Sequence, residues 1–487
     1  MSATDLLDTT QAGSQVIRGG GTRIVGYVVN VAIAVGSSAL LLRYLGVADT
    51  GRYTTVVALT SIVTGITDAG LATIGIREYS HRVGDDRDRM MRALLGLRVT
   101  IATVGLAGAV AFALVAGYDR EMLAGTALAG VSVVILAVQT TWAVPLVATL
   151  RLGRQTALET LRWGLTGVGI AMLVVLGAGL VAMLALAVPV TIVTLLATIP
   201  LIRGEVPMRL SFDATAWRSL ARIAGPYAAA AVAYFAYAYI AMVLFQLIGS
   251  AEETGIYGAA FRIFITVTLL PALFMQVALP VLTRAARDDH DRFAYASGKL
   301  LDVTLIAGGI AIVATVAGAP LAIHLIAGPD FDASIPVLRI QGAAFGMSFL
   351  AAYGSFVLLA QHRDTSLVWG SVAALLTTSV LTLVLGGSIG AQGTALANLA
   401  GETVLAAVYG AALVRAGRSP RPAGRTAPAV VVGAGLALGA AFASGLPSLF
   451  AAALGCAVYS ALLVAAGAVP AELRVEVGRL LSRRRAR

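Results

Sequence analysis

Two arginines lie inside apolar stretches long enough to cross a membrane, and they are the residues best suited to bind an anion there. Arg262 shares a helical face with Gln276, and Arg339 shares one with Tyr353. A charge is costly in the bilayer core, so an ionisable residue there is a candidate for function. A guanidinium supplies a fork of N–H donors that suits an anionic group. Alternatively, both arginines extend to phosphates of the outer leaflet, since both lie in the outer third of their helices.

A polar stripe follows one face of the helix predicted over 390–414. Thr394, Asn398, Glu402 and Tyr409 fall at positions i, i+4, i+8 and i+15. Glu402 lies near the middle of the bilayer, where an unpaired carboxylate would take up a proton. Glu402 and Asn398 are therefore candidates for a proton or sodium site. The alternative is an interhelical hydrogen bond that holds the helices together.

A third group of polar candidates comes from the first half of the chain. Arg23 and Asn30 share a face of the first predicted helix, and Asp68 lies near the end of the second. An Arg23–Asp68 ion pair could gate the inner mouth of a pathway or simply join two helices, and we favour the structural interpretation. Gln139 is a weaker candidate for a cavity lining. Tyr234 could stack on a ligand, although packing is the commoner role of such a tyrosine.

The sequence contains no arrangement typical of an enzyme. There is no G-x-x-x-x-G-K-[ST] loop, so the chain is not expected to hydrolyse ATP, and there is no H-E-x-x-H. The four histidines lack metal-binding spacing, and Cys456 is the only cysteine. We therefore expect no catalytic residue, no metal and no cofactor.

Composition places these candidates in a membrane. The 487 residues are 58% hydrophobic and 12% charged, about half the charged fraction of a soluble domain. Apolar runs of 18 or more residues recur along most of the length, and each can cross a hydrocarbon core of about 30 Å. The chain is therefore expected to be an all-α, polytopic membrane protein. Its polar N-terminal segment lacks the basic region of a cleavable signal peptide.

Counting apolar runs between charged loops predicts about fourteen transmembrane helices. The expected spans are 24–43, 53–76, 94–117, 122–149, 163–182, 184–202, 228–248, 256–281, 300–325, 334–360, 367–387, 390–414, 429–446 and 449–469. Gly51-x-Tyr53 and Gly255-x-Tyr257 each follow an acidic turn and open a long apolar helix. A turn that recurs at this separation indicates two homologous halves, as in many transporters.

We accordingly expect two pseudo-symmetric lobes of six helices and a C-terminal helix pair. Leu210, Trp217, Leu220 and Ile223 fall near helical spacing, which predicts an interfacial amphipathic segment between the lobes. The expected divisions are an N-terminal lobe over 1–203, this linker over 204–226, a C-terminal lobe over 227–414, a Pro/Arg linker over 415–428, and the final pair with a basic tail over 429–487.

The distribution of charge predicts the orientation. With the N-terminus inside, all but five of the 35 basic residues fall in the N-terminal segment, the inner loops and the tail. The exceptions are Arg43, Arg52, Arg120, Arg262 and Arg339. This asymmetry follows the positive-inside rule and places both termini in the cytoplasm. It also accounts for the net charge of +10 without a nucleic-acid partner.

Several stretches carry a family resemblance. They are AEETGIYGAAFRI (251–263), PVLRIQGAAFGMSFLAAYGSFVLLAQHR (336–363) and GSIGAQGTALANL (387–399), with RYLGVADTGRY (43–53) and TDAGLATIGIREYS (67–80) in the first half. They resemble the bacterial polysaccharide flippases of the multidrug/oligosaccharidyl-lipid/polysaccharide exporter superfamily. The resemblance covers residues 17–414. These motifs are turns and packing signatures, so they indicate the family more strongly than the substrate.

The resemblance implies a flippase that moves an undecaprenyl-type lipid-linked oligosaccharide from the inner to the outer leaflet by alternating access around a central cavity. The product would serve O-antigen, capsule, exopolysaccharide or teichoic acid assembly in the bacterial cytoplasmic membrane. The implied partners are the anionic lipid-linked substrate, membrane lipids, and a polysaccharide polymerase or glycosyltransferase complex. Arg262 and Arg339 would then meet the substrate diphosphate.

Three alternatives stay open. A lipid II flippase and a multidrug or cation antiporter belong to the same superfamily, although the antiporters usually have twelve helices and the final pair argues against them. A non-transporting scaffold of a polysaccharide assembly complex is the alternative from another class.

Overall fold

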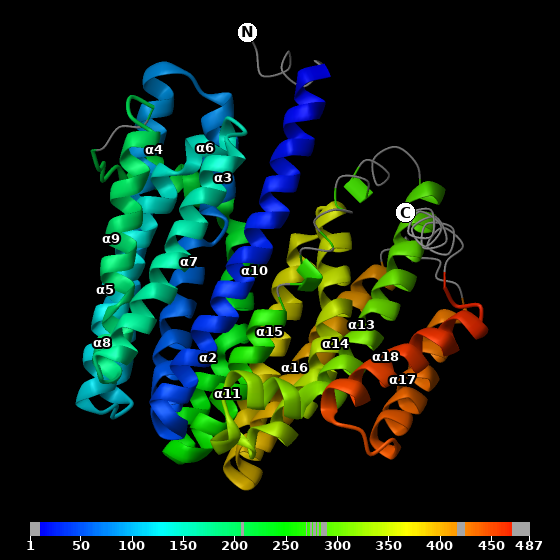
Figure 1. The fold of residues 1–487 in the computed structure, drawn as a ribbon. Coiled ribbons are helices and arrows are strands. Elements are labelled where there is room, and N and C mark those ends of the chain that lie inside the picture. The colour runs from blue at the N-terminus through cyan, green and yellow to red at the C-terminus, as the bar shows by residue number, and fades with distance from the viewer. Residues whose placement is uncertain are drawn as a thin grey trace, which may run out of the picture. The chain divides into compact units, whose positions relative to one another are not determined.

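The structure is a computed structural model, and it describes residues 10–205, 209–268, 270–272, 275, 279, 282–283, 290–415 and 424–469, with backbone alone for 10–25, 27–28, 224, 226–227 and 290. Throughout this described part the regular structure is helical (Figure 1). The chain divides into two compact units, Met1–Tyr239 and Ile240–Arg487. The expected all-α class is confirmed.

The N-terminal unit combines membrane-length helices with short segments (Figure 1). Its elements are α2 (Thr10–Asp68), α3 (Leu71–His81), α4 (Gly84–Val115), α5 (Arg120–Trp142), α6 (Val144–Ala148), α7 (Leu152–Val175), α8 (Leu180–Ala185), α9 (Ala187–Thr198), a 3₁₀ turn (Ile199–Leu201) and α10 (Ala214–Ile248), which continues into the other unit.

The first predicted turn is a break inside α2. Gly46 has φ 70° and ψ −175°, a conformation that glycine adopts without strain. Arg52, just beyond the turn, forms ion pairs with Asp49 (3.2 Å), Asp119 (3.2 Å) and Glu121 (3.7 Å). This arginine was an exception to the predicted charge asymmetry, and the carboxylates at its own end of the unit compensate its charge.

The segment before the second half of the chain packs onto the N-terminal unit. The sequence predicted a separate amphipathic linker over 204–226, whereas residues 214–226 belong to the same helix, α10, as the following span. The indole N–H of Trp217 donates to the carbonyl of Ala93 (3.0 Å), and the backbone N–H of Ser211 donates to that of Arg92 (3.3 Å). Leu220 is buried in the same apolar cluster as the start of α4. Part of the amphipathic face is therefore used for packing.

The C-terminal unit is also a helical bundle. Its elements are α11 (Ala251–Val267), α13 (His290–Ile326), a 3₁₀ turn (Pro329–Phe331), α14 (Ser334–Ala360), α15 (Asp364–Leu381), a π turn (Thr382–Gly386), α16 (Gly387–Arg415), α17 (Thr426–Ala443) and α18 (Ser448–Ala465).

The stretch that opens α11 joins two other helices of this unit. Glu253, in the first turn of α11, accepts the backbone N–H of Ala391 at Oε2 (2.7 Å). Ser334, the first residue of α14, donates its hydroxyl to the carbonyl of Ile256 (2.8 Å). Gly390 lies at a break in α16 with φ 60°, which allows the chain to turn beside Glu253. Segments that separately carry the family resemblance therefore meet at one place.

Twelve helices of the described part are long and apolar enough to cross a membrane, which shows a multi-pass membrane protein. Two of these spans, Val29–His81 and Asp364–Arg415, contain 53 and 52 residues. Each corresponds to about 80 Å of helix against a bilayer core of about 30 Å, and each is interrupted, at Gly46 and at Gly390. The count of fourteen stays a prediction.

The predicted final helix pair is present and packs on α13. Tyr459 of α18 is fully buried and donates its hydroxyl to the carbonyl of Ile306 (3.2 Å). The ring fits because residue 309 is a glycine: a Cβ there would lie 2.0 Å from the tyrosine oxygen. Val313, Val430 and Leu463 complete the apolar contact. The pair is therefore an integral part of the C-terminal unit.

Candidate functional site

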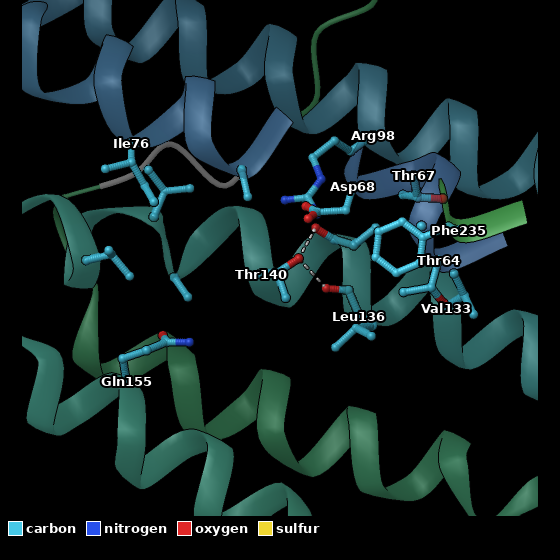
Figure 2. Close-up of a pocket in the computed structure, with 16 residues that line it drawn as sticks. Thr64, Thr67, Asp68, Ile76, Arg98, Val133, Leu136, Thr140, Gln155 and Phe235 are labelled. Atoms are coloured by element: carbon cyan, nitrogen blue, oxygen red, sulfur yellow. Dashed lines mark hydrogen bonds and ion pairs between the residues drawn. The ribbon is translucent and has the colours of Figure 1, made fainter. Parts of the chain in front are cut away.

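A cavity of about 310 Å³ lies within the N-terminal unit (Figure 2). It is lined by α2, α3, α4, α5, α6, α7 and by Phe235 of α10, so that much of the unit contributes to its walls. The walls are largely apolar, and the polar side chains among them are Thr64, Thr67, Asp68, Arg98, Thr140 and Gln155. Figure 2 shows Arg98 and Asp68 extending toward each other at one side of the cavity.

Arg98 is the charged group buried deepest in this wall. Its Nη2 lies 2.9 Å from Oδ1 of Asp68, and its Nη1 donates to the hydroxyl oxygen of Thr141 (3.2 Å). The Arg98 side chain is 3% exposed, whereas that of Asp68 is 46% exposed. The buried Arg98 guanidinium is therefore neutralised by the Asp68 carboxylate, which is itself partly exposed.

Arg98 also lies where two helices end. α2 stops at Asp68, followed by Ala69 (φ 30°) and Gly70 (φ 75°), and α5 stops at Trp142. The short helices α3 and α6 continue from these breaks and contact each other. The C-terminus of a helix carries a partial negative charge, and the two residues that contact the guanidinium, Asp68 and Thr141, lie in the last turns of α2 and α5. The left-handed Ala69 is a strained position that this arrangement holds in place.

A second, smaller cavity of about 210 Å³ adjoins the first and shares Thr64, Val133 and Leu136 with it. Its polar wall consists of hydroxyl groups, those of Tyr53, Thr60, Ser61, Thr64, Ser132 and Thr166. The serine and threonine hydroxyls donate to carbonyls of their own helices. Their oxygen lone pairs therefore remain available to a ligand that donates hydrogen bonds.

The charged groups that line the first cavity are already engaged with each other. The Asp68 carboxylate is already held by an arginine, and the lining residues contain no second acid and no nucleophile–base pair. Within the described residues, no group of three His, Cys, Asp or Glu side chains is placed to hold a metal ion. The expectation that the chain uses no cofactor stays a prediction.

The structure gives Asp68 a partner that the sequence did not suggest. The predicted partner, Arg23, has its side chain outside the described residues, so the Arg23–Asp68 pair stays a prediction. Asn30 is 8% exposed, and its Oδ1 is buried without a hydrogen-bond partner among the described residues. Of these three candidates, the structure places Asp68 in the wall of the cavity.

Two further candidates of the first half have different surroundings. Gln139 is buried and donates from Nε2 to the hydroxyl oxygen of Thr198 (3.1 Å), which joins α5 to α9. It is not among the residues that line either cavity. Tyr234 is 45% exposed, and its ring lies 6.1 Å from that of Phe235 and 6.2 Å from that of Tyr237.

In the C-terminal unit, Arg339 stacks on an aromatic ring of the final helix pair. Its guanidinium carbon lies 5.1 Å from the ring centroid of Phe442 on α17. Its Nε is buried and has no hydrogen-bond partner within the described part of the chain. Arg262 is half-buried on α11. Gln276, its predicted neighbour, lies outside the described residues.

Tyr353, the predicted neighbour of Arg339, is a packing residue in this structure. It is 4% exposed, and its hydroxyl donates to the carbonyl of Ser297 (3.0 Å), which joins α14 to α13.

The polar stripe of α16 faces the interior of the C-terminal unit. Thr394, Asn398, Glu402 and Tyr409 are 0%, 3%, 6% and 3% exposed. At one end of the stripe, Tyr409 fits between Gly354 and Gly370, and its hydroxyl interacts with the Ser371 hydroxyl (3.2 Å). The Nδ2 of Asn398 is buried without a hydrogen-bond partner in the described residues. In this stripe, Tyr409 therefore packs and bonds to neighbouring helices, whereas the Asn398 amide has a donor without a partner in the described residues.

The sequence analysis missed Arg98 and Gln341. Arg98 falls four residues after the predicted start of the 94–117 helix, so it was counted with the basic loop, although its depth was a signal of function or pairing. Gln341 lies within a stretch quoted for the family resemblance. It is fully buried on α14 beside the Tyr257 hydroxyl.

Comparison with known proteins places these features in context. A family model described as "Polysaccharide biosynthesis protein" matches residues 16–286, more than half of the chain. No curated protein matched the sequence. Among solved structures, the lipid II flippase MurJ in an inward closed conformation is similar with a TM-score of 0.75 and 13% identity, over 90% of this chain and 97% of that one.

Two other solved structures show the same architecture at lower similarity. An inward-facing multidrug resistance MATE family transporter of the MOP superfamily has a TM-score of 0.60 and 14% identity, over 78% of this chain and 92% of that one. A MOP superfamily transporter from Pyrococcus furiosus has a TM-score of 0.54 and 15% identity, over 81% and 93%. At these identities the likeness shows the fold.

Proposed function

The chain belongs to the polysaccharide biosynthesis protein family, and from this we propose that it is a flippase for undecaprenyl-type lipid-linked oligosaccharide. It would move its substrate from the inner to the outer leaflet of the bacterial cytoplasmic membrane by alternating access, with both termini in the cytoplasm. The observation that carries the proposal is the family match over residues 16–286. The MurJ-like fold over 90% of the chain supports it.

In this proposal, Arg262 and Arg339 bind the anionic diphosphate. Arg339 supports the assignment because it is half-buried and its Nε has no hydrogen-bond partner in the described residues. The guanidinium carbon lies 5.1 Å from the centroid of the Phe442 ring, and a guanidinium can bind a pair of phosphate oxygens with two N–H groups.

Within the N-terminal unit, the cavities would bind sugar hydroxyls. Sugars present many hydroxyl donors, and the smaller cavity offers hydroxyl oxygens whose own protons are already donated to helix carbonyls. Asp68 would accept from a sugar hydroxyl, since its carboxylate is 46% exposed. Asn30 and Tyr234 remain candidates for contact with the sugars. Gln139 would hold α5 in place through its hydrogen bond to Thr198 of α9.

Glu402 and Asn398 are proposed to couple transport to an ion gradient. Both are buried, and the Asn398 amide has a donor without a partner in the described part of the chain. A buried carboxylate that exchanges a proton or a sodium ion would change its interactions with α14 and α15, which pack against α16.

Two rivals are distinguished by their substrates. A lipid II flippase is supported by the fold likeness to MurJ, and a multidrug antiporter by the weaker likeness to MATE transporters. The final pair α17–α18, packed on α13, favours the first over the second, because antiporters of the superfamily usually have twelve helices. A non-transporting scaffold within a polymerase or glycosyltransferase complex is the remaining rival.

The test is a deletion strain in which lipid-linked intermediates are extracted and assigned to a leaflet. We expect a complete oligosaccharide-diphospholipid to accumulate on the inner face while the surface glycan is lost. Accumulation of lipid II would instead support the first rival. Unchanged intermediates and glycan, in a strain without a redundant flippase, would refute flipping.

Complementation then tests the scaffold. Arg339→Glu should fold and reach the membrane but fail to restore the surface glycan, with Arg154→Glu, an exposed arginine outside the cavities, as the matched control. Full restoration by Arg339→Glu would favour the scaffold.

A further inference from the structure

A third cavity, of about 450 Å³, lies between the start of α4 and the segment that leads into α10, and it shares no lining residue with the two cavities described above. Three arginines line it: Arg82, Arg89 and Arg92. Its floor includes the apolar side chains of Met90 and Leu220. The cavity is therefore a cationic pocket with an apolar base, and we name it the arginine pocket.

The acidic residues of the arginine pocket are already engaged. Asp213 accepts the backbone N–H groups of Thr215 (2.9 Å) and Ala216 (3.2 Å), which caps the first turn of α10. Asp86 lies in the first turn of α4 and pairs with Arg89. Both carboxylates therefore lie at the positive end of a long helix, where their charge is offset.

Arg92 keeps capacity for an anion, whereas Arg82 and Arg89 are each paired with a carboxylate. Arg82 pairs with Glu78 (2.9 Å) at one edge of the pocket. Arg92 donates from Nε to the backbone carbonyl of Asp88 (3.3 Å), an uncharged acceptor. Its charge is thus not matched by a carboxylate in that contact.

The surroundings of the pocket indicate where the anion comes from. Val83, next to Arg82, is 80% exposed, and Phe212, between the pocket residues Ser211 and Asp213, is 69% exposed. Leu210 is 47% exposed in the same segment. Large apolar side chains exposed beside a basic patch are typical of a surface that enters the boundary between lipid headgroups and acyl chains.

From this juxtaposition we propose that the arginine pocket binds the phosphate headgroup of a membrane lipid whose headgroup carries a net negative charge. The guanidinium groups hold the phosphate, and the exposed apolar side chains contact the first part of the acyl or prenyl chain. Because α10 continues from this pocket through the boundary of the two compact units, a bound lipid would fix the start of the helix that connects them. The proposal does not depend on the flippase assignment.

Binding to the purified full-length chain tests this proposal, with native mass spectrometry in detergent as the readout. The probes are phosphatidylglycerol, undecaprenyl diphosphate, phosphatidylcholine and inorganic pyrophosphate. We expect the two anionic lipids to bind, and the tighter of them identifies the source of the phosphate. Phosphatidylcholine and pyrophosphate should bind at least about tenfold more weakly. Pyrophosphate binding as tight as that of the lipids would overturn the lipid part of the proposal.

Variants locate the site. Arg89→Gln combined with Arg92→Gln should weaken lipid binding about tenfold or more, and Phe212→Ser should weaken lipid binding without changing the weak pyrophosphate signal. Arg154→Gln is the matched control, because it removes an exposed positive charge of the same unit outside the pocket. An equal loss in Arg154→Gln and in the double variant would overturn the proposal.

Folding is controlled in the same samples. The double variant should keep the thermal unfolding temperature of the delipidated wild type, and Arg92→Lys, which retains the charge, should recover part of the binding. If Arg92→Lys binds no better than Arg92→Gln while both are folded, charge at this position is not what holds the lipid, and the proposal fails.

Discussion

Arg98 and Asp68 form an ion pair in which the two partners are very unequally buried. The Nη2–Oδ1 distance is 2.9 Å, with the arginine side chain 3% exposed and the aspartate side chain 46% exposed. Removing either residue leaves the charge of the other without its ion-pair partner. Only the charge of Arg98 would then remain uncompensated in the protein interior, because Asp68 is partly exposed. The pair therefore predicts an asymmetry between its two single variants.

Asp68→Asn should destabilise the protein more than Arg98→Gln. The first strands a buried guanidinium, which costs about 3 kcal/mol, although the Thr141 hydroxyl retains part of its stabilisation. The second leaves a carboxylate that water can reach, and about 1 kcal/mol is expected after allowing for its exposure. Thermal unfolding of the purified variants in one detergent measures the difference. Equal losses, or a larger loss for Arg98→Gln, would contradict the assignment of Arg98 as the buried partner.

Gly390→Ala should disrupt the contact between α11 and α16. Gly390 has φ 60°, and a Cβ there would lie 2.5 Å from Oε2 of Glu253, the atom that accepts the Ala391 N–H. Left-handed strain and the clash together should cost about 2 kcal/mol or more. The readout is the unfolding temperature, compared with that of Gly410→Ala.

Gly410 is a suitable control because it lies on the same helix and has no atom within 4 Å of its added Cβ. Alanine there should be neutral or slightly stabilising, since it lowers the entropy of the unfolded chain. A Gly390→Ala variant as stable as Gly410→Ala would show that the turn at Gly390 does not depend on glycine.

Glu402→Gln and Tyr409→Phe should separate function from packing along the α16 stripe. Tyr409→Phe loses the interactions with the Ser371 hydroxyl and the Leu367 carbonyl, so it should lose about 1 kcal/mol of stability but keep ion-dependent transport. Glu402→Gln should keep the fold and abolish the dependence of flipping on the proton or sodium gradient. Flipping in proteoliposomes with and without an imposed gradient measures this. If flipping by Glu402→Gln still depends on the gradient, Glu402 is not the coupling site, and the alternative interpretation as an interhelical hydrogen bond is supported.

The sequence predicted the membrane class, the shared face of the α16 stripe, the turn between the first two spans and a break between the spans 367–387 and 390–414, because each follows from local composition and periodicity. It failed at Arg98 because the position of a residue within a span does not reveal its partners. Asp68 is 30 residues away and Thr141 is 43, and only the packing of α2, α4 and α5 brings them together. Similarly, Arg339 could be flagged as a costly intramembrane charge, but its stacking on Phe442 required the placement of α17.

Tyr118 predicts a loss of stability at alkaline pH. It lies in the turn between α4 and α5, with its ring edge-on to Phe112 at 6.1 Å, and its hydroxyl is buried without a hydrogen-bond partner among the described residues. Burial raises its pKa above the ordinary value of 10.0. Above about pH 10 the unfolded chain releases this proton while the folded chain retains it, so the stabilising contribution present below pH 10 is lost as the pH rises.

Tyr118→Phe removes the titrating hydroxyl. The stability of this variant relative to the wild type should therefore be higher at pH 11 than at pH 8, measured by chemical unfolding in one detergent. Tyr295→Phe, at a residue that is 58% exposed, is the control for removal of a phenol. A stability difference between Tyr118→Phe and the wild type that is the same at both pH values would show that the Tyr118 hydroxyl is accessible to water in the folded protein.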